Sequence, residues 1–382
     1  MIQSKKILCF AFFISFFLFS IVNSYSQTGP GGVGNADGSN GEPANLFWLR
    51  ADSLSLADSD QVNQWNDVSG NNRHFNQPTS DNQPTFRNSV ETINGLPAVI
   101  FDGTDDFLED LDADNYIDGL SGFTLLTIIQ SDVNTGSDAG IFDTEDPDNN
   151  DDLLSIRYDA DGASYGGTDG IKAGINTTGG QTQIESSSGI QTTDSMMLSL
   201  KWSTGNELTL YENGDDDALK GSDDAISGNI AGTQKGLIGR GPKDNGGPGW
   251  DGAIAEIILY DVSLKDAQRT IVENYLSAKY NIPITNDYFT GNGDYLNGIA
   301  GIGQESDGNH TKSNSDGFIV TQNGGLNDGD YVIFAHNNKR NDSINEGTEV
   351  TNNTDVVAAW YRDWYVEKTD AGPGLSGKIA FD

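Results

Sequence analysis

The chain has 382 residues, a formal net charge of −36 at pH 7 and a single cysteine. So negative a field repels nucleic acid and anionic membrane surfaces, and it attracts divalent cations. The cysteine, Cys9, lies in an apolar N-terminal run, so disulfides, thiol catalysis and cysteine metal sites are excluded for the rest of the chain.

Residues 1–26 have the pattern of an export signal. Two lysines precede an apolar run over residues 7–22, and Ser24 and Ser26 predict cleavage before Gln27. The run is shorter than the roughly 20 residues that a membrane span needs, although an uncleaved N-terminal anchor stays open as the alternative. We expect a secreted or outer-surface protein without membrane insertion after cleavage. Its net charge is −38, because the signal holds two lysines and no acid.

The rest of the chain has short apolar runs broken by Gly, Asn and Asp, which is typical of an all-β protein. Residues 27–44 are expected to be a flexible arm with nothing to bury. The run over 123–130 is apolar on both faces, which predicts a central strand. The pattern predicts a sandwich or jelly roll, with strands at 46–50, 64–68, 98–101, 123–130, 140–142, 153–158, 171–175, 196–202, 207–211 and 253–260.

One helix is expected near the end of this domain. Ser263 is the predicted N-cap, with Asp266 as its capping-box partner, and Pro283 ends the helix. Apolar residues at spacings of three and four form one face, which we expect to pack against the sandwich edge: Leu264, Ala267, Ile271, Tyr275 and Ala278.

Residues 284–382 are expected to form a second, smaller β-rich domain. Strands are predicted at 295–302, 318–321, 331–335 and 360–366. The sequence stops at 378–382 inside an apparent strand, so we expect this domain to be incomplete and the protein to continue.

Four blocks resemble a known family. Residues 45–52 (NLFWLRAD), 64–72 (QWNDVSGNN), 94–108 (NGLPAVIFDGTDDFL) and 250–282 resemble the LamG-like, concanavalin A-like jelly-roll domains of exported Bacteroidetes surface proteins. The resemblance covers residues 45–283 and implies that they form a two-sheet antiparallel jelly-roll sandwich. It also implies calcium binding and a role in glycan binding or adhesion. Residues 284–382 resemble an uncharacterised β-rich domain common in the same proteins, which implies type IX secretion.

Two acidic loops are the candidate calcium sites. Asp102, Asp105 and Asp106 follow a predicted strand, and calcium takes six to eight oxygen ligands. The alternative is a strand-capping turn whose carboxylates bond local N–H groups. The second loop offers oxygens at Asp148, Asn150 and Asp152, without the glycine and final glutamate of an EF-hand.

Trp250, Tyr165 and Trp202 are the candidate ligand-binding aromatics, because sugar rings stack on exposed aromatic side chains. The three histidines have no metal-ligand spacing, so no zinc site is expected.

The sequence gives no catalytic carboxylate pattern of the concanavalin-like glucanases, Glu-x-Asp-x-(x)-Glu, within 45–283. Glu256 lies in a strong strand but is followed by Ile258 where Asp is needed, so we interpret Glu256 as an edge or solvent-facing residue. We therefore predict a binding protein and not an enzyme. Its partner is an extracellular glycan or a surface protein. The alternatives are a concanavalin-fold glycoside hydrolase or lyase, and a non-binding adhesin spacer.

Overall fold

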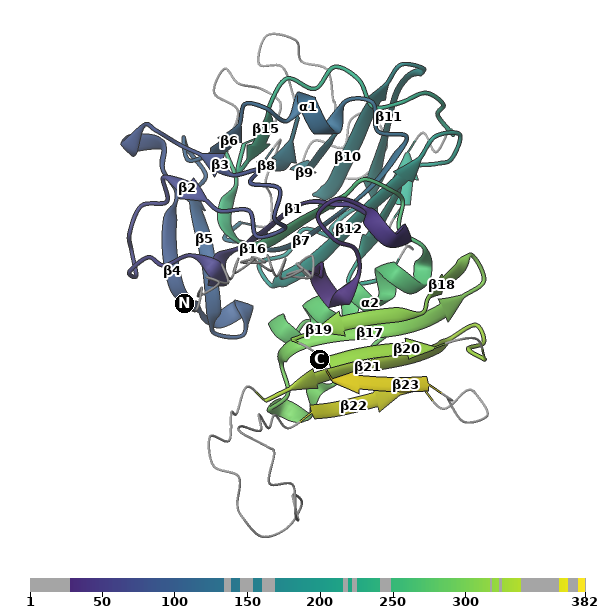
Figure 1. Cartoon of the computed structure of the whole chain (residues 1–382). Coiled ribbons are helices and arrows are strands. Elements are labelled where there is room, and N and C mark those ends of the chain that lie inside the picture. Colours follow the sequence, from purple (N-terminus) through teal and green to yellow (C-terminus); the bar gives the residue numbers. More distant parts are fainter. Residues whose placement is uncertain are drawn as a thin grey trace, which may run out of the picture.

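The computed structural model describes residues 28–133, 139–144, 154–159, 169–215, 219–221, 225–240, 249–316, 318–322, 325–337, 364–369 and 377–381. Throughout these ranges the strands are antiparallel, and the predicted all-β class is confirmed (Figure 1). Among them only α2 (Asp266–Tyr280) is a helix longer than the single turn of α1 (Asp114–Ile117). None of the helices in these ranges is long and apolar enough to span a bilayer.

The first sheet supplies the surface on which the rest of the molecule is built. Its order is β13-β12-β7-β16-β5-β4, and β1 also pairs with β16. The strands are β1 (Asn45–Arg50), β4 (Thr85–Val90), β5 (Leu96–Asp102), β7 (Gly122–Ser131), β12 (Ser195–Ser203), β13 (Thr209–Glu212) and β16 (Asp251–Tyr260).

The second sheet packs face to face with the first. Its order is β14-β11-β10-β9-β8-β15-β6-β3-β2. The strands are β2 (Gln64–Trp65), β3 (Phe75–Asn76), β6 (Leu108–Asp110), β8 (Ala139–Asp143), β9 (Ser155–Asp159), β10 (Gly170–Thr177), β11 (Gly180–Ser186), β14 (Leu219–Gly221) and β15 (Gly236–Ile238).

An apolar core fills the space between these two sheets. Phe47 of β1 lies 5.8 Å from Phe142 of β8, ring centre to ring centre, and so links the two layers. On β7, Leu125 and Ile129 face this core, whereas Leu126 and Ile128 face the opposite side. Both faces of β7 are therefore covered, which explains why its sequence is apolar without alternation.

Helix α2 covers the outer face of the first sheet. Ile271 and Tyr275 belong to the apolar cluster that also contains Leu126 and Ile128 of β7. The predicted capping box is displaced. The helix begins at Asp266, and the backbone N–H of Lys265 donates to Oε1 of Gln268 at 3.2 Å, so Ser263 does not cap it. It ends at Tyr280, before Pro283 is reached, because Asn281 adopts a left-handed conformation.

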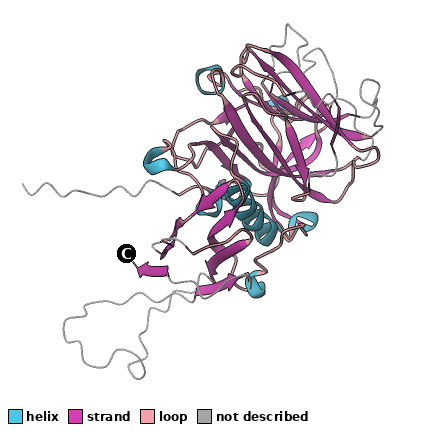
Figure 2. Ribbon diagram, turned by 90° about the vertical axis from the view of Figure 1, so that its right-hand side faces the viewer, coloured by secondary structure: helices cyan, strands magenta, loops and turns pink. Residues whose placement is uncertain are grey.

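A second β-rich part lies on the other side of α2, so that the helix is held between strands of both parts (Figure 2). One of its sheets has the order β18-β17-β21-β22 and the other β19-β20-β23. Phe318 and Phe334 meet in the small core between them. The strands are β17 (Asn297–Glu305), β18 (Gly308–His310), β19 (Lys312–Ser315), β20 (Phe318–Gln322), β21 (Asp330–His336), β22 (Trp364–Lys368) and β23 (Gly377–Phe381). The domain boundary at 283/284 stays a prediction.

The segment from Thr28 to Ala44 is packed, so the prediction of an arm with nothing to bury is wrong. Its first turn, η1 (Pro30–Gly32), contacts α2, β17 and β19, and Val33 is fully buried. Gly32 has a φ of 75°, and a Cβ there would overlap the hydroxyl of Ser313. A glycine-rich composition predicts flexibility, whereas here Gly32 lets the segment lie close against the side chains of Ala300 in β17 and Ser313 in β19.

Candidate functional site

Two of the three candidate ligand-binding aromatics lie in the core, which corrects the prediction that they are exposed. Trp250 is fully buried and meets Tyr158 edge to face, with ring centres 4.9 Å apart. Trp202 is 1% exposed and packs beside Phe123 between the sheets, because the alternation of β12 turns it inward with Leu200. Neither ring offers a face to a sugar. Tyr165 lies outside the described residues.

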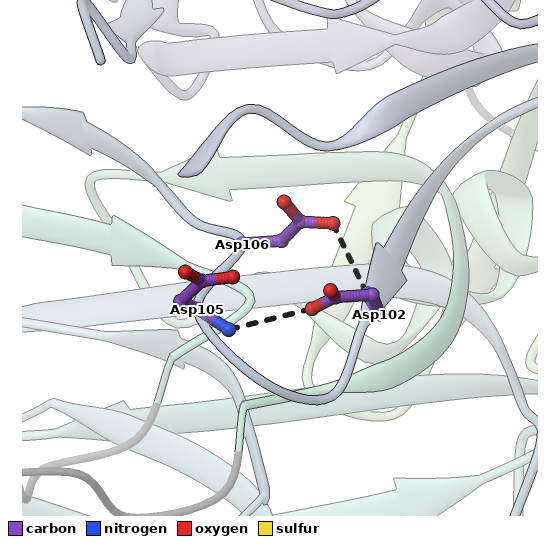
Figure 3. A group of neighbouring side chains, drawn as sticks. All are labelled: Asp102, Asp105 and Asp106. Carbon is purple, nitrogen blue, oxygen red and sulfur yellow. Dashed lines mark hydrogen bonds between the residues drawn. The ribbon is translucent and has the colours of Figure 1, made fainter. Parts of the chain in front are cut away.

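The first predicted calcium loop forms a compact acidic turn between β5 and β6. Oxygen atoms of Asp102, Asp105 and Asp106 all lie within 4.8 Å of one another (Figure 3). Oδ1 of Asp102 accepts hydrogen bonds from the backbone N–H groups of Thr104 at 2.8 Å and Asp105 at 3.3 Å. Oδ2 of Asp106 accepts one from the N–H of Asp102 at 3.1 Å. The carboxylate of Asp102 therefore caps the turn at the end of β5, as the structural alternative to a calcium ligand predicted. The carboxylate of Asp105 has no hydrogen bond within the described ranges.

These carboxylates repel one another. Burial, followed by the charge of Asp102, raises the pKa of Asp106 to about 6. Asp251 lies directly opposite Asp102 in the sheet register, and burial together with Asp132 and Asp102 raises its pKa as well. In the part of the chain that the structure describes, no lysine or arginine forms an ion pair with the three carboxylates of the turn.

The donor set fits a calcium ion. Calcium–oxygen distances are about 2.4 Å, so two oxygens that bind one ion lie at most about 4.8 Å apart. The three carboxylate oxygens meet that limit, and their uncompensated charge is what a hard divalent cation neutralises. The second predicted loop, with Asp148, Asn150 and Asp152, lies outside the described residues.

A polar cavity of about 470 Å³ adjoins this turn on the outer face of the first sheet, and we name it the outer-face cavity. Ile100, Ala253 and Gln130 lie side by side on β5, β16 and β7 and line it. Each of these residues is two positions away from an aspartate, namely Asp102, Asp251 and Asp132 in the same order. The aspartates lie on the same face of the sheet, because side chains along a strand alternate with a period of two. The remaining lining includes Asp58, Arg87, Asn88, Ser89 and Asp132.

The polar lining offers both donors and acceptors. Arg87 pairs with Asp58 through Nη1 and Oδ2 at 3.2 Å, and both side chains are nearly half exposed. Nε2 of Gln130 lies 3.2 Å from Oδ1 of Asp132. The sequence pattern did not reveal this cavity, because its lining comes from four strands and a loop that are far apart in the chain.

Glu256 was interpreted as an edge or solvent-facing residue, and this is wrong. Its carboxylate is fully buried beneath α2. Oε1 accepts hydrogen bonds from Trp48 Nε1 at 2.6 Å and Tyr275 OH at 2.8 Å. Oε2 accepts from Lys279 Nζ at 2.8 Å and Tyr280 OH at 2.7 Å. Glu256 thus accepts four hydrogen bonds, three of them from side chains of α2, and so links α2 to the first sheet.

No protein-family model matches the chain, and no curated protein matches it significantly. Among solved structures, it is similar to domain 4 of an extracellular arabinanase of glycoside hydrolase family 43 from Geobacillus stearothermophilus, in complex with arabinotriose. That match has a TM-score of 0.36 at 15% identity over 60% of this chain and 98% of that one.

Two further solved structures are similar to the chain. A Trypanosoma rangeli sialidase has a TM-score of 0.42 at 15% identity, over 64% of this chain and 35% of the sialidase. A family 54 α-L-arabinofuranosidase has a TM-score of 0.44 at 12% identity, over 73% of this chain and 68% of that one. The chain thus spans about a third of the sialidase's length.

These matches overturn the prediction that the chain is not an enzyme, because the structures similar to it come from glycoside hydrolases. That prediction is not retained. Identities this low and TM-scores below 0.5 assign neither a reaction nor a substrate to this chain.

Proposed function

We propose that the chain has a carbohydrate-related function. It is an exported surface protein of LamG-like build that binds an extracellular glycan in the outer-face cavity, beside a turn held by calcium. The observation that carries the proposal is the adjacency of the cavity and the acidic turn, at the ends of three neighbouring strands. A glycan offers many hydroxyl groups, and Arg87 and Asp58 can donate to and accept from them.

Calcium has a defined place in this proposal. Asp102, Asp105 and Asp106 would hold the ion, which supplies positive charge to a turn that otherwise repels itself. A fixed turn then fixes the ends of β5 and β16, which form one wall of the cavity. The ion is structural in this proposal, and the cavity contacts the glycan.

The test is binding of the full chain to a panel of purified polysaccharides, with calcium or with a chelator. Arg87→Gln removes a cavity donor at little cost in stability, because exposed ion pairs contribute about 0–1 kcal/mol. We expect its glycan affinity to fall about tenfold, the equivalent of one hydrogen bond to a charged group. Asp105→Asn removes a calcium ligand without breaking a hydrogen bond of the turn, and Asp328→Asn on the exposed surface is the matched control.

Binding that needs calcium in the wild type and the control, but is weak in Asp105→Asn, would support both parts of the proposal. Absence of binding to every polysaccharide would refute it. Equal binding by Arg87→Gln would remove the outer-face cavity from it.

Glycan hydrolysis is the second candidate function, and the closeness of the carboxyl groups in the acidic turn favours it. A glycosidase uses a pair of neighbouring carboxyl groups with one as the proton donor, and burial raises the pKa of Asp106 to about 6. Asp106 would be the general acid, with Asp105 as the second carboxylate. Release of reducing ends from the same polysaccharides measures this directly. Loss of release in Asp106→Asn would support hydrolysis, and no release by the wild type would refute it.

A further inference from the structure

The outer-face cavity has two chemically different ends, because its lining runs across four neighbouring strands of the first sheet. Gln130 on β7 and Asp132 just beyond it form one end, whereas Arg87 on β4 lies at the other with Asp58. β16 and β5 lie between β7 and β4 in the sheet order. Neighbouring strands are about 4.8 Å apart, so three spacings separate the two ends by about 14 Å.

The β7 end offers hydrogen-bond acceptors. Nε2 of Gln130 donates to the carbonyl oxygens of Ser131 at 2.6 Å and Thr193 at 3.2 Å, and it lies 3.2 Å from Oδ1 of Asp132. Three acceptors around this atom fix the orientation of the amide, since its oxygen has no proton to donate. Gln130 is only 8% exposed, yet its Oε1 receives no hydrogen bond from the described residues and is not closed to solvent. The amide therefore offers a ligand an acceptor and no donor.

The same end carries negative charge. The side chain of Asp132 is exposed, and its backbone N–H donates to the carbonyl oxygen of Asp251 at 2.8 Å, so the two aspartates are neighbours on adjacent strands. Burial, followed by the charges of Asp132 and Asp102, raises the pKa of Asp251. In the part of the chain that the structure describes, neither Asp132 nor Asp251 forms an ion pair with a lysine or arginine.

The nearest sources of positive charge do not reach Asp132. Arg87 pairs with Asp58 at 3.2 Å and stays at the far end of the cavity. A calcium ion held by Asp102 would lie two strand spacings from Asp132, or about 10 Å. That separation exceeds the Debye length of about 8 Å at about 0.15 M salt, so the ion's effect on this exposed carboxylate is largely screened.

These features restrict the class of ligand at the β7 end. An ammonium group carries three donors, a positive charge and no acceptor, which complements a carboxylate beside an amide oxygen. An anionic sugar would be repelled. A metal ion is disfavoured, because Asp132 and Asp251 belong to no group of three carboxylates close enough to share one within the described ranges. A neutral hydroxyl group can bind here, but it leaves the charge of Asp132 unused.

We propose that the outer-face cavity recognises an oligosaccharide with a free amino group, whose ammonium donates hydrogen bonds to Asp132 and to Oε1 of Gln130. Hydroxyl groups further along the sugar reach Arg87 and Asp58 at the other end. Hydrogen bonds between charged groups are roughly twice as strong as neutral ones, so the amino group decides which glycan binds. This inference rests on the proposed function, since it names the class of sugar that the same cavity takes.

The test compares glucosamine oligosaccharides with their N-acetylated counterparts, which have the same linkage without the charge, and with anionic oligogalacturonates. Calorimetry would use the full chain with calcium at about 0.15 M salt, where the long-range attraction of an acidic protein for any cation is screened. Asp132→Asn removes the charge but keeps Oδ1 for Gln130. Asp328→Asn on the exposed surface changes the net charge equally and is the matched control.

We expect the wild type and Asp328→Asn to bind glucosamine oligosaccharides about tenfold more tightly than the N-acetylated ones, and Asp132→Asn to lose this preference. The wild type should also lose it at about pH 9. An amine beside electron-withdrawing groups has a pKa of about 8, as the α-amino group does, whereas carboxylates stay ionised there. The pH comparison needs no variant, so it decides the matter even if Asp132→Asn folds poorly.

Each other result counts against the inference. Equal binding of acetylated and free amino sugars would overturn it and leave the proposed function standing. A preference that is the same in Asp132→Asn and Asp328→Asn, or that persists at about pH 9, would also overturn it, because the cavity carboxylate would then not be the partner of the amine. Binding to no glycan of any class would refute the proposed function, and this inference with it.

Discussion

Replacing Glu256 with glutamine is expected to destabilise the junction between the first sheet and α2. In the native protein its two oxygens accept four hydrogen bonds, from Trp48, Tyr275, Lys279 and Tyr280. The glutamine amide can still accept on one side, but on the other it turns N–H groups toward Lys279 and Tyr280. The tyrosine hydroxyl can rotate and accept, whereas an ammonium group has no lone pair and cannot.

The size of this destabilisation follows from the positive charge of Lys279, which loses a buried carboxylate partner when Glu256 is replaced. Although burial disfavours its charge, Glu256 and neighbouring groups raise the pKa of Lys279 well above its ordinary value. Without Glu256, the ammonium group keeps Asp52, 3.0 Å away, as its carboxylate partner. Removing one partner of a buried ion pair costs about 3–5 kcal/mol. At about 2–4 °C per kcal/mol for a domain of this size, the melting temperature should fall by roughly 6–20 °C.

Thermal and urea unfolding of Glu256→Gln, Lys279→Met and the double variant measure this. The double variant should lose less than the sum of the two single losses, because neither charge is then left alone. Glu91→Gln on the exposed surface should stay within about 0.5 kcal/mol of the wild type. If the free energy of unfolding of Glu256→Gln lies within about 1 kcal/mol of the wild-type value, the hydrogen bonds of Glu256 do not hold α2 to the first sheet as we argue.

Four further predictions concern the packed segment, the acidic turn, His310 and the core. Gly32→Ala should destabilise the protein by about 1–3 kcal/mol in urea unfolding, because the Cβ overlaps Ser313 at a positive φ. Calcium at 100 times its dissociation constant should add about 2.7 kcal/mol over the chelated protein above pH 6, and less below pH 6, where a proton occupies Asp106. Burial lowers the pKa of His310 to about 4 in the folded protein, below its unfolded value of 6.5, so folding stability that depends on the neutral ring is present above about pH 6.5 and is lost as the pH falls toward 4. The melting temperature of His310→Asn should therefore fall less than that of the wild type over this pH range. Trp250→Ala should lower stability by about 3–5 kcal/mol in urea unfolding, without a selective loss of glycan affinity in the folded protein.

The fold class was predictable because strand signals are local. The apolar run at 123–130 becomes β7, the run at 253–260 lies in β16, and the run at 98–101 lies in β5, with boundaries shifted by a few residues. Each signal depends on neighbouring side chains and on the turns that end them. The position of the acidic turn could be predicted for the same reason, because Asp102 directly follows the apolar run 98–101.

The candidate site was less predictable, because burial depends on partners far along the chain. Trp250 follows a glycine-rich loop, which favoured exposure, yet Tyr158 covers its ring. Glu256 is the one charged residue in the apolar run 253–260, which favoured an edge or solvent-facing position, yet α2 covers it. A sequence pattern shows that two faces of a strand differ, but it does not show what packs on the polar one.

The N-terminal segment makes the same point. Glycines at 31, 32 and 34 are the residues expected of a flexible linker, and the same absence of side chains lets the segment lie between α2 and β17. Once there, the segment contacts His310 from two sides, because the carbonyl oxygen of Gly32 lies 3.2 Å from Nε2 and Oε2 of Glu42 lies 3.7 Å from Nδ1. These contacts depend on packing that the composition of residues 28–44 argues against.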